Sequence, residues 1–461
     1  MNNATLKNIH LIAIGGSIMH NLALALHQKG LHITGSDDEI FEPAKSRLQE
    51  KGLLPEQEGW FPEKITAGLD AVIVGMHARA DNPELLQAQA LGLKIFSFPE
   101  FIYEQAKNKQ RIVIGGSHGK TSITSIIMHV LRFHGRKFDY AVGAQLEGFE
   151  NMVQLTEDAP IIIIEGDEYL SSPIQRVPKF HLYRHHIGVI SGISWDHINV
   201  FPDPDVYHRQ FRKFVEMTPK AGAIIYNQDD EQTQLVCVPR NTDVKYIGYS
   251  AHENVVRHGI TYLKTKKEEV PLQVFGDHNL RNINAAKEVC KLIGIKGQAF
   301  YEAITTFKGA ARRLELLDSN KSCRIYKDFA HAPSKVKATT QAIKAQFPQS
   351  RLVACLELHT FSSLNKDFLP EYQHTLDAAD LPIVYYNPKT LEHKRMPALS
   401  AADITGAFSN NNLQVFTDSI QLADYLKSLT WENQNLLLMS SGNYNNMDLH
   451  ALSAAVLHPK R

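Results

Sequence analysis

The segment Gly116-Ser117-His118-Gly119-Lys120-Thr121 constrains the fold of this chain more than any other, because apolar segments flank it on both sides. Residues 111–114 before it have the composition of a buried strand, and residues 123–131 after it carry apolar side chains at helical spacing. A strand, a glycine turn and a helix in this order can hold phosphates. Glycines let backbone N–H groups approach the phosphate oxygens, and the helix N-terminus adds positive potential. We therefore expect residues 116–121 to bind a nucleoside triphosphate.

Within this turn the residue types have separate expected roles. Lys120 would reach the terminal phosphates, and Thr121 would offer its hydroxyl to Mg²⁺. Ile114 occupies the position where the general GxxxxGK[ST] pattern has its first glycine, so the prediction depends on the flanking strand and helix. A tight glycine turn without a ligand is the alternative.

The N-terminal segment shows a second nucleotide-binding pattern. An apolar run over residues 9–14 leads into Gly15-Gly16-Ser17, a helical pattern, and a second strand at 32–37 that ends in Asp37. An acidic residue about 20 residues after a glycine turn is typical of the Rossmann arrangement. Later strands of the same sheet are expected at 71–74 and 94–96.

Strands alternate with helical segments along the rest of the chain, which predicts an α/β protein with parallel sheets throughout. With 461 residues the chain is long enough for two or three domains. The polar stretch 107–110 and a second break at 313–321 divide it. We expect an N-terminal Rossmann-like domain over 1–108, a central P-loop ATPase-like domain with a parallel or mixed sheet over 109–313, and a C-terminal Rossmann-like domain over 314–461.

Composition excludes several classes of protein. The 49 Lys and Arg residues balance 49 Asp and Glu, so nothing in the net charge indicates a nucleic-acid or membrane partner. The four scattered cysteines form no CxxC pair and suit a reducing cytosol. The apolar run at 9–14 is shorter than a signal-peptide core, and no run approaches the roughly 18 residues that span a bilayer. We expect a cytoplasmic protein, a monomer or weak homodimer.

Carboxylates and a histidine follow two of the predicted central strands. Glu165 comes after four isoleucines, and Asp196-His197 follows the strand at 187–193. The carboxyl ends of parallel strands form the edge where such sheets bind ligands, and Mg²⁺ prefers oxygen ligands. The alternatives are a solvated acidic turn for Glu165 and a structural histidine at position 197.

Three later motifs are ambiguous when taken singly. Asn279 and Asn282 offer paired donors and acceptors that suit an adenine edge, but they could equally be helix caps. The Arg312-Arg313-Leu314-Glu315 motif suits a phosphate or a surface ion pair. Asp328 and His331 end a strand and open a helix, where Asp328 could hold a ribose hydroxyl.

Taken in order, these motifs resemble those of the Mur ligase family, the ATP-dependent amide ligases of peptidoglycan assembly, across nearly the whole chain. The resembling segments are 116–121, 165–168, 196–197, 278–282 and 312–315. The resemblance implies ATP and Mg²⁺ as cofactors, with Lys120, His197 and Arg313 as catalytic residues and Thr121, Glu165 and His197 at the metal. It implies nucleotide contacts from Gly116, Ser117, His118, Gly119, Lys120, Thr121, Ser122, Asn279, Asn282, Arg313, Asp328 and His331.

The N-terminal turn is similar to that of family members that act directly on UDP-N-acetylmuramate. This implies substrate contacts from Gly15, Gly16, Ser17, Met19, Ser36, Asp37, His77 and Asn82. Residues 328–333 and 439–442 look most like the murein-recycling branch, which adds the tripeptide L-alanyl-γ-D-glutamyl-meso-diaminopimelate. The alternatives are the L-alanine-adding ligases and a P-loop ATPase without ligase activity.

The chain departs from the family pattern at three positions. Ala13 replaces the first glycine of the N-terminal turn, and Lys327 and Ala332 replace an acid and a histidine of the DDxxHHP motif. The replacements at Lys327 and Ala332 affect how the amine substrate would be bound. On the C-terminal segment the candidates for contacting that substrate are Arg351, His359, Asn365 and Lys366.

Overall fold

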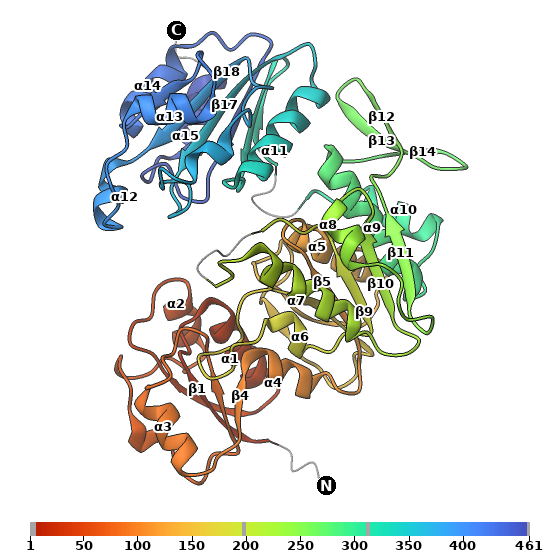
Figure 1. Ribbon diagram of the computed structural model, residues 1–461, viewed down its shortest axis with the longest axis vertical. Helices are drawn as coiled ribbons and strands as arrows, with labels where there is room; N and C mark the ends of the chain where they lie inside the picture. Colours follow the sequence, from red (N-terminus) through yellow and green to blue (C-terminus); the bar gives the residue numbers. More distant parts are fainter. Residues whose placement is uncertain (1–5, 196–199, 310–313, 459–461) are drawn as a thin grey trace. The chain divides into compact units, whose positions relative to one another are not determined.

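The computed structural model describes residues 6–195, 200–309 and 314–458 (Figure 1). The chain divides into two compact units, one formed by residues 1–250 with 281–303 and the other by 251–280 with 304–461. Among the described residues no helix has both the length and the apolar character that crossing a membrane requires.

The first unit begins with a four-stranded parallel sheet in the order β2-β1-β3-β4. Its strands are β1 (Asn8–Ile12), β2 (His32–Ser36), β3 (Ala71–Val74) and β4 (Ile95–Ser97). Its helices are α1 (Ser17–Gln28), α2 (Ala44–Glu50), η1 (Pro62–Lys64), α3 (Pro83–Ala90) and α4 (Phe98–Gln105). Alternating residues of β1 face opposite sides, so Ile9 and Leu11 pack with α1 while Ile12 packs with Leu85 of α3.

A seven-stranded sheet in the order β11-β10-β9-β5-β8-β6-β7 forms the centre of the same unit. All of its pairings are parallel except β6–β7. Its strands are β5 (Gln110–Gly115), β6 (Asp139–Ala141), β7 (Val153–Gln154), β8 (Ile161–Glu165), β9 (Ile187–Ile190), β10 (Ala223–Asn227) and β11 (Lys245–Tyr249). Its helices are α5 (Lys120–Phe133), α6 (Lys179–Leu182), α7 (Pro204–Glu216), α8 (Glu231–Val236), α9 (Asp277–Leu292) and α10 (Gln298–Ile304).

The second unit contains a six-stranded sheet in the order β15-β16-β20-β17-β18-β19, parallel except for β15–β16. Its strands are β15 (Glu315–Ser319), β16 (Cys323–Asp328), β17 (Arg351–Leu358), β18 (Leu381–Tyr386), β19 (Gln414–Phe416) and β20 (Gln434–Met439). Residues of α11 (Pro333–Gln346) and α13 (Ala401–Phe408) cover one face of this sheet, and α14 (Ser419–Ser428) and α15 (Leu449–Leu457) cover the other. The short helices η2 (Leu369–Tyr372) and α12 (Pro388–His393) complete this unit.

The predicted α/β class is confirmed, but the prediction of parallel sheets throughout is wrong. A small antiparallel sheet, β12 (Asn254–Arg257), β13 (Ile260–Lys264) and β14 (Glu269–Pro271), belongs to the second unit. The stretch 313–321, expected as a break, contains the antiparallel edge strand β15. These strands are short and mix exposed with buried or half-buried residues, so they lack the continuous apolar runs that mark buried parallel strands.

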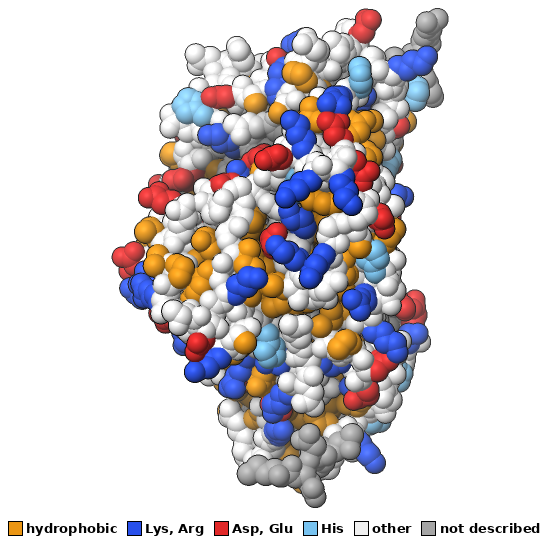
Figure 2. Space-filling model, turned by 90° about the vertical axis from the view of Figure 1, so that its right-hand side faces the viewer, with side chains coloured by type: hydrophobic (Ala, Val, Ile, Leu, Met, Phe, Trp, Pro, Cys, Tyr) orange, Lys and Arg blue, Asp and Glu red, His pale blue; other side chains and the backbone are white. Residues whose placement is uncertain are grey.

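Charge on the surface is mixed. In the face that Figure 2 presents, Lys and Arg side chains gather near the middle, while Asp and Glu are scattered around them. Because the chain as a whole has zero net charge, this gathering is a local feature that composition does not reveal.

The departure at Ala13 has a backbone consequence. Ala13 is buried and has φ of 66°, a left-handed conformation that costs a non-glycine residue about 1–2 kcal/mol. We expect Ala13→Gly to leave the free energy of unfolding close to wild type, because relief of strain offsets the lost methyl group. Ala25→Gly, an equally buried control inside α1, is expected to lower it by roughly 2 kcal/mol. Equal losses in denaturant titrations of both variants would contradict the strain at Ala13.

Candidate active site

The predicted phosphate-binding turn lies between the end of β5 and the start of α5 at Lys120. Gly116 and Gly119 both have positive φ, 121° and 79°. A Cβ at Gly116 would lie 2.3 Å from Ser191 Oγ, and one at Gly119 would lie 2.4 Å from Asn282 Oδ1. Only glycine fits both positions, because the turn is packed closely between the end of β9 and helix α9.

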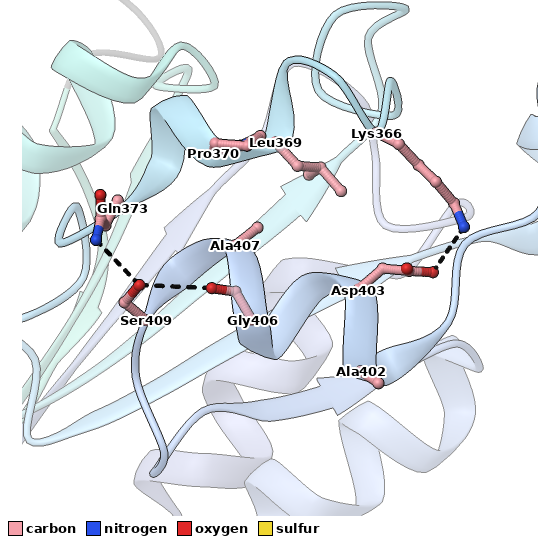
Figure 3. A pocket seen from close by; sticks show the side chains of 9 residues that line it. All are labelled: Lys366, Leu369, Pro370, Gln373, Ala402, Asp403, Gly406, Ala407 and Ser409. Carbon is pink, nitrogen blue, oxygen red and sulfur yellow. Dashed lines mark hydrogen bonds and ion pairs between the residues drawn. The ribbon is translucent and has the colours of Figure 1, made fainter.

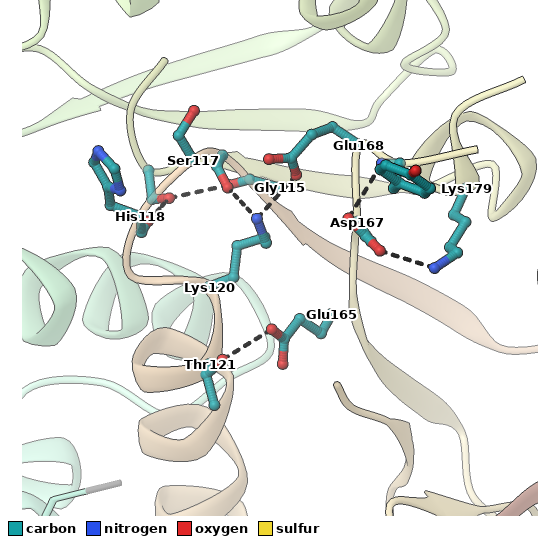
Figure 4. A network of polar contacts seen from close by, with 12 residues as sticks. Gly115, Ser117, His118, Lys120, Thr121, Glu165, Asp167, Glu168 and Lys179 are labelled. Atoms are coloured by element: carbon teal, nitrogen blue, oxygen red, sulfur yellow. Dashed lines mark hydrogen bonds and ion pairs between the residues drawn. The ribbon is translucent and has the colours of Figure 1, made fainter. Parts of the chain in front are cut away.

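Lys120 is held by carboxylates that follow β8. Its Nζ donates to Glu168 Oε2 at 2.9 Å and to the Gly116 carbonyl oxygen (Figure 4). Burial lowers the pKa of the Lys120 ammonium, but the charges of Glu168 and Asp167 outweigh this and leave that pKa raised. Lys120 is therefore a fixed cation at the turn, where the terminal phosphates of a nucleotide would lie.

Thr121 in the first turn of α5 and Glu165 at the end of β8 are in direct contact. The Thr121 hydroxyl donates to Glu165 Oε1 at 2.8 Å (Figure 4). Glu165 Oε2 accepts from the Gly143 N–H at 3.1 Å. One hydroxyl and one carboxylate beside a phosphate site fit Mg²⁺, which commonly takes one or two carboxylates together with substrate phosphates and water. Among the described residues no group of three or more His, Cys, Asp or Glu could hold a metal ion.

The loop after β9 forms the other wall of the turn. Ser117 Oγ donates to the Ser194 carbonyl oxygen at 2.8 Å, and His118 Nε2 lies 3.2 Å from Ser194 Oγ. The chain is therefore anchored beside the turn two residues before Asp196-His197. The predicted residues His197, Arg312 and Arg313 lie outside the described residues, so their roles stay predictions.

Helix α9 carries the two asparagines of the third motif, and they differ in their contacts. Asn282 lies against the turn at Gly119, whereas Asn279 Nδ2 donates to the Phe275 carbonyl oxygen at 2.8 Å. Both side chains are largely buried. The structure thus brings Asn282 to the phosphate-binding turn, while Asn279 forms a local bond at the start of the helix.

Of the residues predicted to contact the substrate, Gly15 in the turn after β1 and Asp37 are joined by a hydrogen bond. The Gly15 N–H donates to Asp37 Oδ2 at 2.7 Å, and the Gly16 carbonyl oxygen accepts from His20 Nδ1 at 3.0 Å. The side chain of Ser17 lies at the start of α1. The remaining predicted contacts are distributed as follows: Met19 and Ser36 are buried, Asn82 caps α3, and His77 is exposed.

Burial raises the pKa of Asp37 to about 6; the Gly15 N–H bond lowers it and the neighbouring Asp38 raises it again. A raised pKa means that the native state prefers the protonated carboxyl. The stability associated with Asp37 is therefore complete below pH 3.8 and is lost as the pH rises through about 6.

Asp37→Asn keeps an acceptor for Gly15 without the charge. We expect it to raise the free energy of unfolding above pH 6, by roughly 2 kcal/mol, and to have little effect near pH 4. Urea titrations across this pH range measure the difference. Asp81→Asn, which removes an exposed carboxylate, serves as the control and should show no such pH dependence. A constant difference between Asp37→Asn and wild type at all pH values would contradict the assignment.

In the second unit, Asp328 and His331 lie at the carboxyl end of β16. The Asp328 carboxylate accepts backbone N–H bonds from Leu314 and Ala330, both at 2.7 Å, and is largely buried. His331 Nδ1 donates to the Phe329 carbonyl oxygen at 2.9 Å. These bonds shape the turn between β16 and α11, and their roles toward a nucleotide stay predictions.

A cavity of about 410 Å³ opens beside this turn. Lys327, Phe329, His359 and residues 440–443 line it. Lys327 makes no ion pair with any residue that the structure describes, and the buried Ser441 hydroxyl has no hydrogen-bond partner there. Lys327 thus brings a cation to the position where the family pattern has an acid.

The other candidates on this unit lie elsewhere. Arg351 begins β17, at the opposite end of that strand from the cavity. Lys366 pairs with Asp403 at 3.0 Å in a separate pocket of about 450 Å³ between η2 and α13 (Figure 3). Of the named candidates, His359 alone lines the cavity beside Lys327.

Sequence reasoning missed two residues of the Lys120 network. Glu168 lies within the resembling segment 165–168 but has no predicted role of its own, yet it is the carboxylate that pairs with Lys120. The Tyr207 hydroxyl donates to Glu168 Oε1 at 3.1 Å and lies 2.9 Å from Ser117 Oγ. The sequence signal for Glu168 is its position three residues after Glu165, at the end of β8. Tyr207 on α7 has no comparable signal in the sequence around it.

Comparisons with known proteins match most of the chain to one family. Three family descriptions match in succession: "Mur ligase family, catalytic domain" over residues 8–110, "Mur ligase middle domain" over 114–290, and "Mur ligase, glutamate ligase domain" over 312–442. A UDP-N-acetylmuramate–L-alanine ligase from Caldicellulosiruptor bescii is 31% identical over 81% of this chain and 82% of its own. A UDP-N-acetylmuramate–L-alanyl-γ-D-glutamyl-meso-2,6-diaminoheptandioate ligase from Haemophilus influenzae is 25% identical over 95% of this chain and 97% of its own.

Solved structures show the same fold. A murein peptide ligase from Psychrobacter arcticus superposes with a TM-score of 0.63 at 22% identity, covering 99% of this chain and 100% of its own. A UDP-N-acetylmuramate–alanine ligase from Thermotoga maritima gives a TM-score of 0.68 at 19% identity, covering 95% of this chain and 96% of its own.

Proposed function

The chain belongs to the Mur ligase family of ATP-dependent amide-forming ligases, and we propose that it joins UDP-N-acetylmuramate to the tripeptide L-alanyl-γ-D-glutamyl-meso-diaminopimelate. The observation that carries the proposal is the 410 Å³ cavity lined by Lys327, which makes no ion pair within the part of the chain that the structure describes. It lies in the C-terminal part of the chain, where the sequence predicts the amine-substrate domain.

The carboxylate of UDP-N-acetylmuramate is a poor electrophile because its negative charge repels an incoming amine, so it must first be activated. Transfer of the γ-phosphoryl of ATP to this carboxylate gives an acyl phosphate and ADP. The amine attacks the acyl carbon and a tetrahedral intermediate forms. The bond between the acyl carbon and the phosphate oxygen then breaks, inorganic phosphate leaves, and the nitrogen loses a proton as the amide is made. Such transfer depends on positioning and charge stabilisation.

The described residues divide this work among themselves. Lys120 would stabilise negative charge on the transferred phosphoryl group, and Glu168 keeps it oriented toward the turn. Thr121 and Glu165 would hold Mg²⁺, which neutralises phosphate charge when bound. Asp37, with Gly15 and Gly16, would hold the uridine nucleotide on the first sheet.

The C-terminal cavity supports the tripeptide over a single amino acid. Its volume exceeds what one alanine side chain and carboxylate would fill, and the Lys327 ammonium group, an imidazole and serine hydroxyls line it. The tripeptide bears several carboxylates, and ammonium and hydroxyl groups are suitable donors for them. L-alanine is the second candidate, favoured by the names of several similar proteins.

Phosphate release tests the proposal. Purified protein receives ATP, Mg²⁺ and UDP-N-acetylmuramate, with the tripeptide or L-alanine offered separately. We expect rapid release with the tripeptide and slow release with L-alanine. Release that depends on L-alanine would move the assignment to the second candidate, and release that ignores both amines and the UDP-sugar would overturn ligation on this substrate.

A further inference from the structure

The central sheet has a second hollow at its amino edge, at the opposite end of the strands from the phosphate-binding turn. This hollow, which we call the basic pocket, has a volume of about 580 Å³. It is lined by the first residues of β5, β9, β10 and β11 and by the segments 107–109 and 220–222. The polar stretch 107–110 marked a domain boundary in the sequence, and the proposed function gives it no other role.

Four lysines line the basic pocket, and no Asp or Glu among the described residues does. Three of these lysines have a carboxylate partner outside the lining: Lys107 with Glu104 at 2.7 Å, Lys109 with Asp139 at 2.6 Å, and Lys220 with Asp243 at 3.2 Å. Lys245 is exposed and forms no ion pair within the described ranges.

Further positive charge lies directly behind the lining. The guanidinium groups of Arg111 and Arg184 lie over the Tyr103 ring, at 5.1 and 4.9 Å from its centroid. Arg111 donates to the carbonyl oxygens of 106, 107, 109 and 184, so no carboxylate neutralises it there. The four lining lysines and these two arginines make six cations, and four carboxylates lie near them: Glu104, Asp139, Asp243 and Glu157, whose charge also acts on Lys109.

We propose that the basic pocket binds a small anion carrying two or more phosphate groups. Separate ammonium groups around one hollow suit a ligand with several charged groups, and lysine binds phosphate as a point charge. Its volume lies in the range of small-molecule sites, and Ile187 and Leu292 add an apolar wall for an organic portion. The six residues of β5 span roughly 20 Å, which separates this site from the turn at 116–121.

The test measures binding of inorganic triphosphate by calorimetry to the full chain carrying Lys120→Ala/Glu168→Gln, which removes the main cation of the phosphate-binding turn together with its buried partner charge. In this background Lys220→Gln/Lys245→Gln is compared with Lys51→Gln/Lys137→Gln. The control pair removes the same net charge from exposed lysines elsewhere in the first unit, and Lys137, like Lys220, pairs with an aspartate.

We expect the pocket variant to bind triphosphate at least about tenfold more weakly, because it loses two charge-assisted contacts, and the control to bind like its parent. Amine labelling of the wild-type protein should show protection of Lys220 and Lys245 by triphosphate. Equal weakening in both variants, or absence of binding in the parent, would overturn the site. Equal binding of citrate would overturn its phosphate preference. None of these outcomes depends on ligase activity, so failure here and failure of the proposed function are distinguishable.

Discussion

Lys120→Ala is expected to abolish ATP-dependent ligation, lowering kcat by roughly 10³-fold or more. Lys120 is the cation fixed at the phosphate-binding turn by Glu168 and Gly116. Without it the charge on the transferred phosphoryl group loses its nearest partner. Phosphate release with all substrates present measures the loss.

The single variant also leaves Glu168 buried without its cation, which can cost about 3–5 kcal/mol of stability. Lys120→Ala/Glu168→Gln removes both charges and separates folding from catalysis. We expect the double variant to unfold at nearly the wild-type denaturant concentration and to remain inactive. Lys179→Ala, which breaks the neighbouring pair with Asp167 at 2.8 Å, should cost less than tenfold. Substantial turnover by the double variant would refute the role of Lys120.

Glu165→Gln is expected to raise the Mg²⁺ concentration needed for half-maximal turnover at least tenfold. The glutamine can still accept the hydrogen bond from Thr121, so local geometry is kept while the negative charge is lost. A Mg²⁺ titration of phosphate release measures the shift.

Asp167→Asn is the matched control for this charge. Asp167 lies two residues away, and its carboxylate pairs with Lys179 instead of approaching Thr121. We expect its Mg²⁺ titration to follow the wild type within a few fold. Equal shifts in both variants would indicate a general electrostatic effect and would remove Glu165 from the metal site.

The proximity of Thr121 and Glu165 could be predicted from sequence because both come shortly after predicted strands. The run of apolar residues before Gly116 and the isoleucines before Glu165 marked neighbouring strands, and parallel strands bring their carboxyl ends to one edge. The structure accordingly places the Thr121 hydroxyl 2.8 Å from Glu165 Oε1, although 44 positions separate them. Asn282 lies against the turn at Gly119 because it is on helix α9, at whose start the sequence motif stands.

Other features depend on packing that no local pattern encodes. Tyr207 reaches Glu168 from helix α7, and nothing in its own segment distinguishes it from a core tyrosine. The β12–β13 hairpin is joined by the two-residue turn His258-Gly259. Both residues have positive φ, as such a turn between antiparallel strands requires, and the glycine is the part of this turn that the sequence shows. The raised pKa of Asp37 follows from burial, which the sequence around it does not show.

The proposed ligation requires a triphosphate held at the turn between β5 and α5. A crystal structure of the protein with Mg²⁺ and a non-hydrolysable ATP analogue tests this most directly. We expect the phosphates within hydrogen-bonding distance of the backbone N–H groups of 117–121, with the Lys120 ammonium turned from Glu168 toward the terminal phosphates. A triphosphate bound elsewhere, with the turn empty and the contact between Lys120 and Glu168 unchanged, would contradict the account.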